Sequence, residues 1–398
     1  MPKSSSVFSQ LPTVKVSSRG GKRLKDGHVW VYRSDVDSAE GVAPGAVVRV
    51  SDERGRVLGT ALYSSASQIA VRMISREAVE DFDPLLRVRL REAAAYRDKV
   101  VSESNAYRLV FSEADFLPGL IVDRYNDLLS LQILTQAMDA EPVRSAILSE
   151  TSALFQAAGI VERVDARVRE LEKLPPRSSG LLEGEKSSTV FTMNGVQFQF
   201  DALAGQKTGA FLDQRENYAA AARYAHGEAL DVFCYQGGFA LHLAEKCSQV
   251  TGVDSSRPAL EAADRNSALN HREIEWIEAN AFDLLRDYAD AGRGYDTIVL
   301  DPPAFAKTKS SLPTALRGYK ELNLRALKML RPGGVLVTCS CSYHVGAAEF
   351  LEMVAEAARD ARRNLRVLES RSQSRDHPIL VNVPETSYLK CLILIVSN

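Results

Sequence analysis

The chain of 398 residues lacks the features that would place it in a special class of protein. Its apolar runs all fall short of the ~20 residues that cross a bilayer, and its first residues, MPKSSSVFSQLP, contain no apolar core of a signal peptide. It also has no internal repeat and no low-complexity tract. With 45% hydrophobic and 25% charged residues, we expect a globular protein of two or three domains that does not associate with a membrane.

Cysteine is scarce. Five are present, an odd number scattered over a large chain: Cys234, Cys247, Cys339, Cys341 and Cys391. This usage predicts reduced thiols and a cytoplasmic location. Cys339 and Cys341 form a C-x-C pair, but no second pair stands at zinc-finger spacing and C-x-x-C is absent. We therefore expect neither a metal site nor a thioredoxin-like redox pair.

The chain as a whole has no large excess of positive or negative charge, and its formal net charge is −2. Residues 13–33 are the exception, with a local charge of +5. Asp26 is their one acidic residue, and their basic residues are Lys15, Arg19, Lys22, Arg23, Lys25 and Arg33. Trp30 and Tyr32 are interleaved with them, a pattern that suits contact with a nucleic-acid backbone. We take Arg19, Lys22, Arg23 and Lys25 as candidate RNA contacts; a solvated basic turn is the other interpretation.

Turn signals divide the first part of the chain. Residues 13–75 contain short strand patterns punctuated by glycine and proline, which predicts a small β-barrel or β-sandwich module at 1–78. A helical pattern from Asp83 to Val101, strands within 107–134 and a helix near 141–158 predict a middle α/β domain at 79–188. The polar stretch RSSGLLEGEKSS within this domain is the best candidate for a linker or exposed loop.

The remaining residues, 189–398, alternate strand and helix patterns, which predicts a parallel sheet with crossover helices. The strand candidates are EALDVF, QVTGVD, EIEWIE, YDTIVLD and GGVLVTCS. Two further strands, LRVLES and SYLKCLILIVS, have no long helix between them and should form an antiparallel hairpin at the sheet edge. An α/β, Rossmann-like, doubly wound sheet with such a hairpin is the layout of class I S-adenosylmethionine-dependent methyltransferases.

The first strand of this region leads into ALDVFCYQGGFALHLA. The dinucleotide fingerprint G-x-G-x-x-G is absent here. The form D-x-F-x-x-x-G-G-F instead resembles the first motif of RNA methyltransferases, so Asp231, Gly237 and Gly238 are candidate S-adenosylmethionine contacts. Asp254 ends the second strand, where a carboxylate accepts hydrogen bonds from ribose. Asn280 follows the third strand, in a slot that is usually acidic in relatives, and its carbonyl can accept a hydrogen bond from adenine.

The fourth strand ends in Asp301-Pro302-Pro303, followed by Ala304 and Phe305. Proline cannot donate to a ladder, so the chain must leave the sheet at its carboxyl edge, where such sheets bind ligands. Asp301 should therefore lie near the cofactor, and Phe305 could stack on a base or pack in the core. D-P-P-[FY] in methyltransferases is associated with amino-group methylation, which makes a base nitrogen one candidate target.

Cys341, at the end of the fifth strand, suggests another target. Carbon 5 of a pyrimidine is a poor nucleophile until a thiolate adds at carbon 6, which requires an activated cysteine. Packing is the alternative role for Cys341. His344, three residues on, could tune the thiol or pack locally.

Four segments in order carry a family resemblance: QKTGAFLDQRENY, DVFCYQGGFALHLA, DPPAFAKTK and CSCSYHV. With the basic β module, LPGLIVDRY and DHPILVNVPETSYLK, they make most of the chain similar to the PUA-domain-containing 23S ribosomal RNA cytosine-C5 methyltransferase family. The resemblance implies an N-terminal PUA RNA-binding domain and S-adenosylmethionine as cofactor.

The resemblance also implies roles for individual residues. Cys341 would be the nucleophile that attacks cytosine carbon 6, and Cys339 a neighbour that need not be cysteine. Gln214, Arg215 and the segment that starts at Lys207 would close over the cofactor or the RNA. Many cytosine-C5 enzymes carry a second cysteine after a proline in the D-P-P region, where this chain has Pro303. The base that removes the carbon-5 proton is therefore open: Asp301, a water or another side chain.

The leading hypothesis is methyl transfer from S-adenosylmethionine to carbon 5 of a cytosine in large-subunit (23S) ribosomal RNA through a covalent cysteine adduct. An RNA methyltransferase that modifies a guanine or adenine nitrogen without that adduct is the first alternative. An RNA-binding assembly factor and a small-molecule methyltransferase are two others. A homodimer is compatible with the sequence, which does not identify the modified nucleotide.

Overall fold

The computed structural model describes residues 11–79, 81–203, 210–306 and 308–397. These residues form two compact units that each combine separate stretches of the chain. Unit 1 takes its residues from Met1–Thr189, Phe200–Gly209 and Asp376–Thr386, and unit 2 from Val190–Gln199, Ala210–Arg375 and Ser387–Asn398. The connection between the last two strands of the chain thus belongs to unit 1. The predicted domain boundaries at 78 and 188 stay predictions.

The first sheet of unit 1 has six strands in the described residues, in the order β2-β6-β5-β4-β1-β3. They are β1 (Thr13–Val16), β2 (Trp30–Tyr32), β3 (Val36–Ser38), β4 (Val47–Ser51), β5 (Val57–Tyr63) and β6 (Ile69–Ser75). Pairing is antiparallel except between β1 and β4, which run parallel. The valines of alternate positions, among them Val14, Val16, Val48 and Val50, are fully buried and form the core of this module.

A helix interrupts the basic segment, for which short strands punctuated by turn signals were predicted. It is α1 (Ser18–Lys25), and the Ser17 hydroxyl caps its N-terminus by accepting from the Gly20 amide at 3.3 Å. The sequence pattern missed this helix because Gly20 and Gly21 have low helix propensity. Both glycines are buried, and a Cβ on Gly20 would approach the Asp35 Cβ to 3.1 Å. Close packing on the sheet therefore outweighs their propensity.

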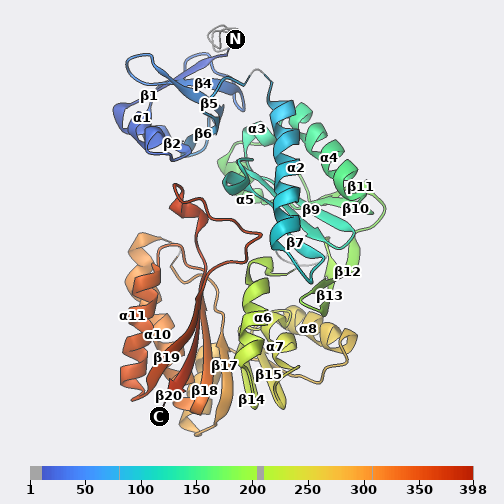
Figure 1. Cartoon of the computed structure of the whole chain (residues 1–398), viewed down its shortest axis with the longest axis vertical. Coiled ribbons are helices and arrows are strands. Elements are labelled where there is room, and N and C mark those ends of the chain that lie inside the picture. The colour runs from blue at the N-terminus through green and yellow to red at the C-terminus, as the bar shows by residue number, and fades with distance from the viewer. Residues whose placement is uncertain (1–10, 80, 204–209, 307, 398) are drawn as a thin grey trace. The chain divides into compact units, whose positions relative to one another are not determined.

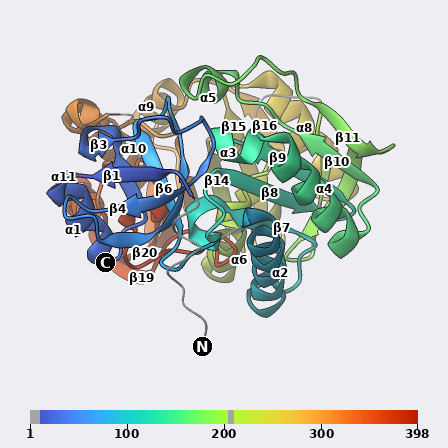
Figure 2. The ribbon, with the colours of Figure 1, turned by 90° about the horizontal axis from the view of Figure 1, so that it is seen from above.

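The second sheet of unit 1 has five strands in the described residues, in the order β11-β10-β9-β8-β7. The strands are β7 (Ala106–Phe111), β8 (Leu120–Tyr125), β9 (Leu128–Ile133), β10 (Gly159–Glu162) and β11 (Gly180–Gly184). Its helices are α2 (Phe82–Val100), α3 (Gln136–Asp139), α4 (Glu141–Phe155) and α5 (Ala166–Leu171). Figure 2 shows α2 and α4 beside β7, β8 and β9, and their apolar faces share one core with these strands.

One prediction for this region is wrong. The stretch RSSGLLEGEKSS was expected to be a linker or exposed loop, but Gly180–Gly184 within it forms β11, antiparallel to β10. The sequence pattern does not predict this strand, because β11 lies at the edge of the sheet and its side chains are exposed or half-buried. Backbone hydrogen bonds rather than apolar burial therefore define it.

A buried arginine ties the returning segment Asp376–Thr386 into unit 1. The Arg97 side chain is 1% exposed and forms an ion pair with Asp115. It also donates to the carbonyl oxygens of Arg108, at 2.8 Å, and of Asp376, at 2.7 Å. The Asp376 carboxylate in turn accepts from the Arg108 amide at 2.8 Å. A buried charge is costly unless it is paired in this way, so Asp376 is an integral part of unit 1.

Two strands, β12 (Ser188–Met193) and β13 (Val196–Asp201), form a separate antiparallel pair. They are joined at Asn194 and Gly195, which both have positive φ, as the tight turns of two-residue hairpins require. This pair was not predicted, because the alternating pattern from residue 190 onward was assigned to the parallel sheet.

The sheet of unit 2 has seven strands in the described residues, in the order β16-β15-β14-β17-β18-β20-β19. They are β14 (Glu228–Val232), β15 (Gln249–Asp254), β16 (Glu275–Glu278), β17 (Tyr295–Leu300), β18 (Leu330–Ser340), β19 (Asn364–Arg371) and β20 (Lys390–Ser397). The first five pair in parallel, and β20 pairs antiparallel with both β18 and β19. This confirms the predicted Rossmann-like sheet with a terminal antiparallel hairpin.

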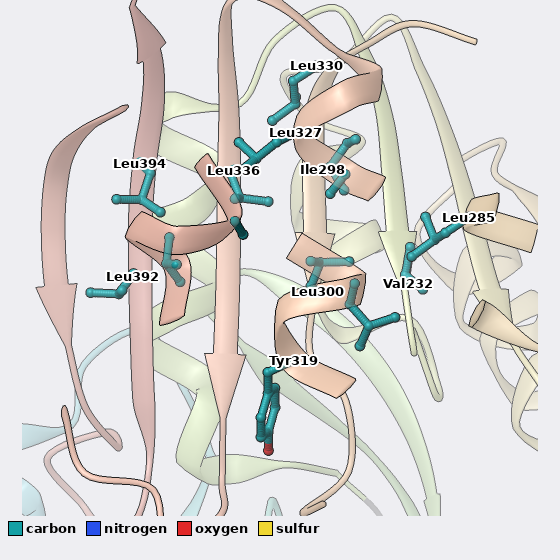
Figure 3. Packing of buried hydrophobic residues seen from close by; sticks show 14 of the residues in the cluster. Val232, Leu285, Ile298, Leu300, Tyr319, Leu327, Leu330, Leu336, Leu392 and Leu394 are labelled. Atoms are coloured by element: carbon teal, nitrogen blue, oxygen red, sulfur yellow. The ribbon is translucent and has the colours of Figure 1, made fainter. Parts of the chain in front are cut away.

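Helices cover both faces of this sheet (Figure 1). They are α6 (Arg215–Tyr224), α7 (Gly238–Leu243), α8 (Arg257–Leu269), α9 (Ala281–Asp290), α10 (Leu312–Met329) and α11 (Ala347–Asp360). Figure 3 shows Leu327 and Tyr319 of α10 against Ile298, Leu300 and Leu336 of the strands. These side chains are at most 1% exposed, so the central strands are buried as a parallel sheet requires. Within the described ranges, no helix combines the length and apolarity needed to cross a membrane.

We expect Leu336→Ala to lower the free energy of unfolding of unit 2 by about 3 kcal/mol, because it leaves a cavity beneath α10. Trp30 lies in unit 1 and Trp276 in unit 2, so urea unfolding in a Trp30→Phe background follows unit 2 through Trp276 fluorescence. Leu351→Ala, at a side chain on α11 that is 45% exposed, is the control and should change little. Equal effects of the two variants would contradict the core assignment.

Candidate active site

The carboxyl end of β14 carries a buried carboxylate. Asp231 is 0% exposed, and its Oδ2 accepts from the Ala240 amide of α7 at 2.8 Å. Its Oδ1 is buried and has no hydrogen-bond partner in the part of the chain that the structure describes. Burial raises the pKa of Asp231 to about 7, with a further contribution from the charge of Asp254. Such an oxygen is ready to accept from a ligand or to carry a proton itself.

The turn after β14 is tight and strained. Phe233 and Tyr235 have positive φ angles of 67° and 49°, which non-glycine residues rarely adopt, and Gly237 has a φ of 85°. A Cβ on Gly237 would lie 2.9 Å from the Trp276 ring, and one on Gly238 would lie 2.5 Å from the Tyr218 ring. The two glycines therefore form a turn without side chains, a glycine cradle against which the Trp276 and Tyr218 rings pack.

Asp254, at the end of β15, faces this turn. One carboxylate oxygen accepts from the Tyr235 amide at 3.0 Å and the other from the Ser256 amide at 2.9 Å. Each carboxylate oxygen has two lone pairs, so Asp254 can still accept from a ligand. The side chain is half-buried, which leaves it within reach of such a ligand.

Asn280, beyond β16, is the N-cap of α9. Its Oδ1 accepts from the Phe282 amide at 2.9 Å and from the Asp283 amide at 3.3 Å. Because only the oxygen can accept from these two amides, the NH₂ group is the part of the exposed side chain left for a ligand. The carbonyl that was expected to accept from adenine is thus already used by the helix.

Asp301, at the end of β17, lies among other acidic groups. Its Oδ1 accepts from Gln214 Nε2 at 2.9 Å, and the Gln214 oxygen accepts from Asn217 Nδ2 at 2.7 Å. Burial, together with the charges of Asp213 and Asp231, raises the pKa of Asp301 to about 8. Asp301 is therefore protonated in a large fraction of molecules at neutral pH.

Aromatic side chains surround the space between these groups. Phe211, Tyr218, Phe233, Tyr235 and Phe239 line a narrow pocket of about 20 Å³ that also reaches Asp301. This volume holds about one water molecule. Phe211 is 44% exposed, and its ring centroid lies 5.1 Å from that of Tyr235.

Cys341 follows the last residue of β18 and lies next to the Asp301 turn. Its Sγ lies 3.9 Å from the Pro302 carbonyl oxygen, and the side chain is half-buried. Burial, together with the charges of Asp301 and Asp213, raises the pKa of the thiol to about 11. Cys339, in contrast, is fully buried opposite Cys391 in the β18–β20 ladder. The C-x-C pair therefore separates into one packed thiol and one accessible thiol.

Phe305 packs against the rings of Tyr319 and Phe282. Its ring centroid lies 4.7 Å from that of Tyr319 and 6.0 Å from that of Phe282. The Tyr319 hydroxyl is 2.9 Å from Ser342 Oγ, which also accepts from the Ala306 amide at 3.1 Å. These bonds join the D-P-P-A-F segment to the segment that carries Cys341. Phe305 is half-buried, so part of its side chain stays accessible.

Sequence reasoning missed two charged residues at this site. Asp213 accepts from the Tyr388 hydroxyl through Oδ2 at 2.7 Å, while its Oδ1 is buried with no partner among the described residues. Lys390 donates to the Ser342 carbonyl beside Cys341 at 2.6 Å. The signal for Lys390 was a lysine directly before the apolar run CLILIV. Asp213 gave no signal beyond its place before Gln214.

Arg215 is 2% exposed at the start of α6, and its carbonyl oxygen accepts from Asn194 Nδ2 at 2.7 Å. Its guanidinium lies 3.5 Å from the Glu216 carboxylate. These contacts hold Arg215 within unit 2, directly after Gln214 in the sequence. Lys207 lies outside the described residues.

The four basic candidates for RNA contact all lie in unit 1, on α1. Arg19 and Arg23 both form ion pairs with the buried Asp35, at 2.5 Å and 3.2 Å, and Lys25 pairs with Asp52 at 3.2 Å. Lys22 is exposed and has no ion-pair partner among the described residues. The free positive charge of this surface is therefore smaller than the sequence suggested.

Comparison with known proteins agrees with this architecture. A PUA-like domain matches residues 14–76, and the S-adenosylmethionine-dependent methyltransferase family matches residues 135–394. The chain belongs to the S-adenosylmethionine-dependent methyltransferases. S-adenosylmethionine is accordingly its cofactor, as predicted.

Relatives narrow the family further. The chain is 38% identical to ribosomal RNA large subunit methyltransferase I of Photobacterium profundum over 93% of this chain and 95% of the relative. It is 40% identical to the protein of the same name from Shewanella amazonensis, over 96% of this chain and 98% of the relative. It therefore belongs to the same methyltransferase family as these proteins. A Streptococcus mutans S-adenosylmethionine-dependent methyltransferase shares the fold, with a TM-score of 0.81, 20% identity, and coverage of 96% of this chain and 100% of that one.

The residues of unit 2 fit this cofactor. The glycine cradle lies directly after β14, and Asp231 has a buried oxygen ready to accept a hydrogen bond. Asp254 can accept from ribose hydroxyls and Asn280 can donate to a ring nitrogen of adenine. A sulfonium would favour the ionised forms of the buried carboxyl groups at 231 and 301, because opposite charges attract.

We expect Gly238→Ala to weaken binding of S-adenosylhomocysteine by about tenfold or more, because the new methyl group requires the packed Tyr218 ring to move. Isothermal titration calorimetry measures the dissociation constant. Gly180→Ala is the matched control, since nothing lies within 4 Å of its Cβ position. An unchanged dissociation constant for Gly238→Ala would show that the cradle does not hold the cofactor.

Proposed function

We propose that this chain transfers a methyl group from S-adenosylmethionine to carbon 5 of a cytosine in 23S ribosomal RNA through a covalent adduct with Cys341. The observation that carries the proposal is the half-buried Cys341 thiol beside the Asp301-Pro302 turn, at the sheet edge that holds the cofactor residues. Identity of 38–40% to ribosomal RNA large subunit methyltransferases I supports the substrate. A ribosomal substrate also supports the cytoplasmic location.

Several side chains would bind the cofactor. Asp254 would accept hydrogen bonds from the ribose, and the Asn280 NH₂ group would donate to the adenine ring. Gly237 and Gly238 would let the backbone approach, and Asp231 would accept a hydrogen bond from the ligand. When bound, S-adenosylmethionine supplies an electrophilic methyl group and a positive charge.

Gln214 would hold Asp301, since its amide already donates to that carboxyl. Arg215, buried next to it in the chain, would keep this segment in place. Phe305, with one side of its ring covered by Tyr319, would stack on the target base.

The covalent step uses Cys341. Its thiolate adds to carbon 6 of the cytosine, which forms an S–C bond and moves the electron pair of the 5,6 double bond to carbon 5. Carbon 5 uses this electron pair to bond to the methyl group, whose bond to sulfur breaks and leaves S-adenosylhomocysteine. A base then removes the proton on carbon 5. The electron pair of that C–H bond then restores the double bond and expels the Cys341 thiolate.

Asp301 is the proposed base for the carbon-5 proton. Burial and its acidic neighbours raise its pKa to about 8, which makes it a far stronger base than an exposed carboxylate. Pro303, where related enzymes carry a second cysteine, offers no competing group.

RNA affinity would come from unit 1. Lys22 and the exposed parts of Arg19, Arg23 and Lys25 on α1 would contact phosphates and set the register, while the base itself enters the pocket of unit 2. Lys207 and a homodimer stay predictions.

The decisive test is Cys341→Ser with methyl-labelled cofactor and unmodified 23S ribosomal RNA, followed by mass spectrometry of the nucleosides. We expect 5-methylcytidine with the wild type and a loss of at least about a thousandfold with the variant, since serine is not ionised enough to add to carbon 6. Cys339→Ser is the matched control and should retain the product. A methylated guanine or adenine that survives Cys341→Ser would favour base-nitrogen methylation through D-P-P-A-F.

The pH dependence provides a second test. Both Asp301 and Cys341 must lose a proton to act, so kcat/KM should rise with pH from 6.5 to 8, by about tenfold per unit where one deprotonation limits. Steady-state methylation at constant ionic strength measures this profile, and calorimetric binding of S-adenosylhomocysteine at each pH is the control. A flat or falling profile over this range would contradict Asp301 as the base.

A further inference from the structure

β20 begins with a lysine in an apolar environment. Lys390 pairs across the ladder with Ser340, the last residue of β18, and precedes the buried residues Cys391 to Leu394. The side chain is half-buried. A cation at such a position loses hydration, so the fold must compensate it with polar contacts or a negative partner.

The compensating contacts surround the Cys341 segment. Lys390 Nζ donates to the Ser342 carbonyl oxygen at 2.6 Å and to the Tyr388 carbonyl oxygen at 2.8 Å. An ammonium has three N–H donors, so one remains after these two bonds. The first bond anchors the ammonium on the residue directly after Cys341, and its charge acts on the thiol.

The groups around Cys341 are otherwise mostly acidic or neutral. Asp301 faces it from the end of β17, Asp213 from the segment before α6, and Tyr319 from α10. Both carboxylates raise the pKa of the thiol, whereas Lys390 lowers it. The effect is mutual: burial lowers the pKa of Lys390 to about 8, and Cys341 raises it.

We propose that Lys390 is a positioning residue that holds the Cys341 turn and supplies the positive charge that stabilises the Cys341 thiolate. This rests on the proposed function, in which that thiolate attacks the base. Two acidic neighbours and partial burial oppose ionisation of the thiol, so the reaction needs a cation at this place. Lys390 meets the need from the neighbouring strand without occupying the space of the substrate.

Chemical modification of Cys341 tests this without methyl transfer. The rate of reaction with methyl methanethiosulfonate, a small thiolate-specific probe, is measured from pH 6.5 to 10 on the full chain and assigned to Cys341 by peptide mass spectrometry. Lys390→Gln keeps a hydrogen-bond donor without the charge, and Lys390→Arg keeps both. Lys320→Gln, at a lysine on α10 that pairs with Glu356 and Asp360, is the control for loss of a lysine elsewhere.

We expect Lys390→Gln to slow modification of Cys341 by about tenfold at pH 7, equivalent to a rise of about one unit in the thiol pKa. The difference from the wild type should shrink above pH 8, where the lysine loses its own proton. Lys390→Arg should react nearly as fast as the wild type and keep its advantage over Lys390→Gln at higher pH, because arginine stays charged. Cys247 provides an internal reference whose rate should be equal in all variants.

Equal Cys341 rates in wild type, Lys390→Gln and Lys390→Arg would overturn the inference. So would a loss shared by Lys390→Gln and Lys390→Arg at every pH, which indicates a purely structural role. These outcomes are distinct from failure of the proposed function, which shows as 5-methylcytidine formation by Cys341→Ser. If the reaction rate of Cys341 depended on Lys390 in a chain that methylates a base nitrogen, the inference would hold although the proposed function had failed.

Discussion

The parallel pairing of β14, β17 and β18 is the constraint on which the site depends. Because β17 pairs with β14 on one side and β18 on the other, the three strands end at the same edge of the sheet. Asp231, Asp301 and Cys341 stand at or just beyond these ends, although 110 residues of sequence separate the first from the last. The buried leucines under α10 hold the strands in this register, so core packing also determines the geometry of the site.

Burial, which stabilises the core, also changes the pKa values of the groups at the carboxyl edge of the sheet. Water is excluded from Asp231, Asp301 and Cys341 to differing degrees, and each has its pKa raised. A carboxyl that titrates near neutrality can exchange protons with a substrate, which an exposed carboxylate does poorly. The cost is a thiol that resists ionisation, and a lysine on the neighbouring strand is the counterpart that the fold offers.

Much of unit 2 could be predicted from the sequence because strand-ending motifs and alternating apolar runs report directly on a parallel sheet. Its parallel strands, the terminal hairpin and the cofactor followed from them. Other features depend on contacts that no local pattern reveals. α1 forms despite Gly20 and Gly21 because they pack on the sheet, β11 is defined by backbone pairing, and Asn280 turns its oxygen to a helix end. The place of Lys390 near Cys341 could not be predicted, because it depends on the pairing of Lys390 with Ser340 in the ladder.

The path of the chain has a consequence for how this protein can be dissected. Asp376 is hydrogen-bonded to buried Arg97 in unit 1, yet the strands on either side of its segment belong to the sheet of unit 2. Neither unit is therefore one continuous piece of polypeptide. An N-terminal fragment would keep Arg97 but lose one of its buried partners, and a C-terminal fragment would carry Asp376 without its site. During synthesis, too, unit 1 stays incomplete until Asp376–Thr386 has left the ribosome.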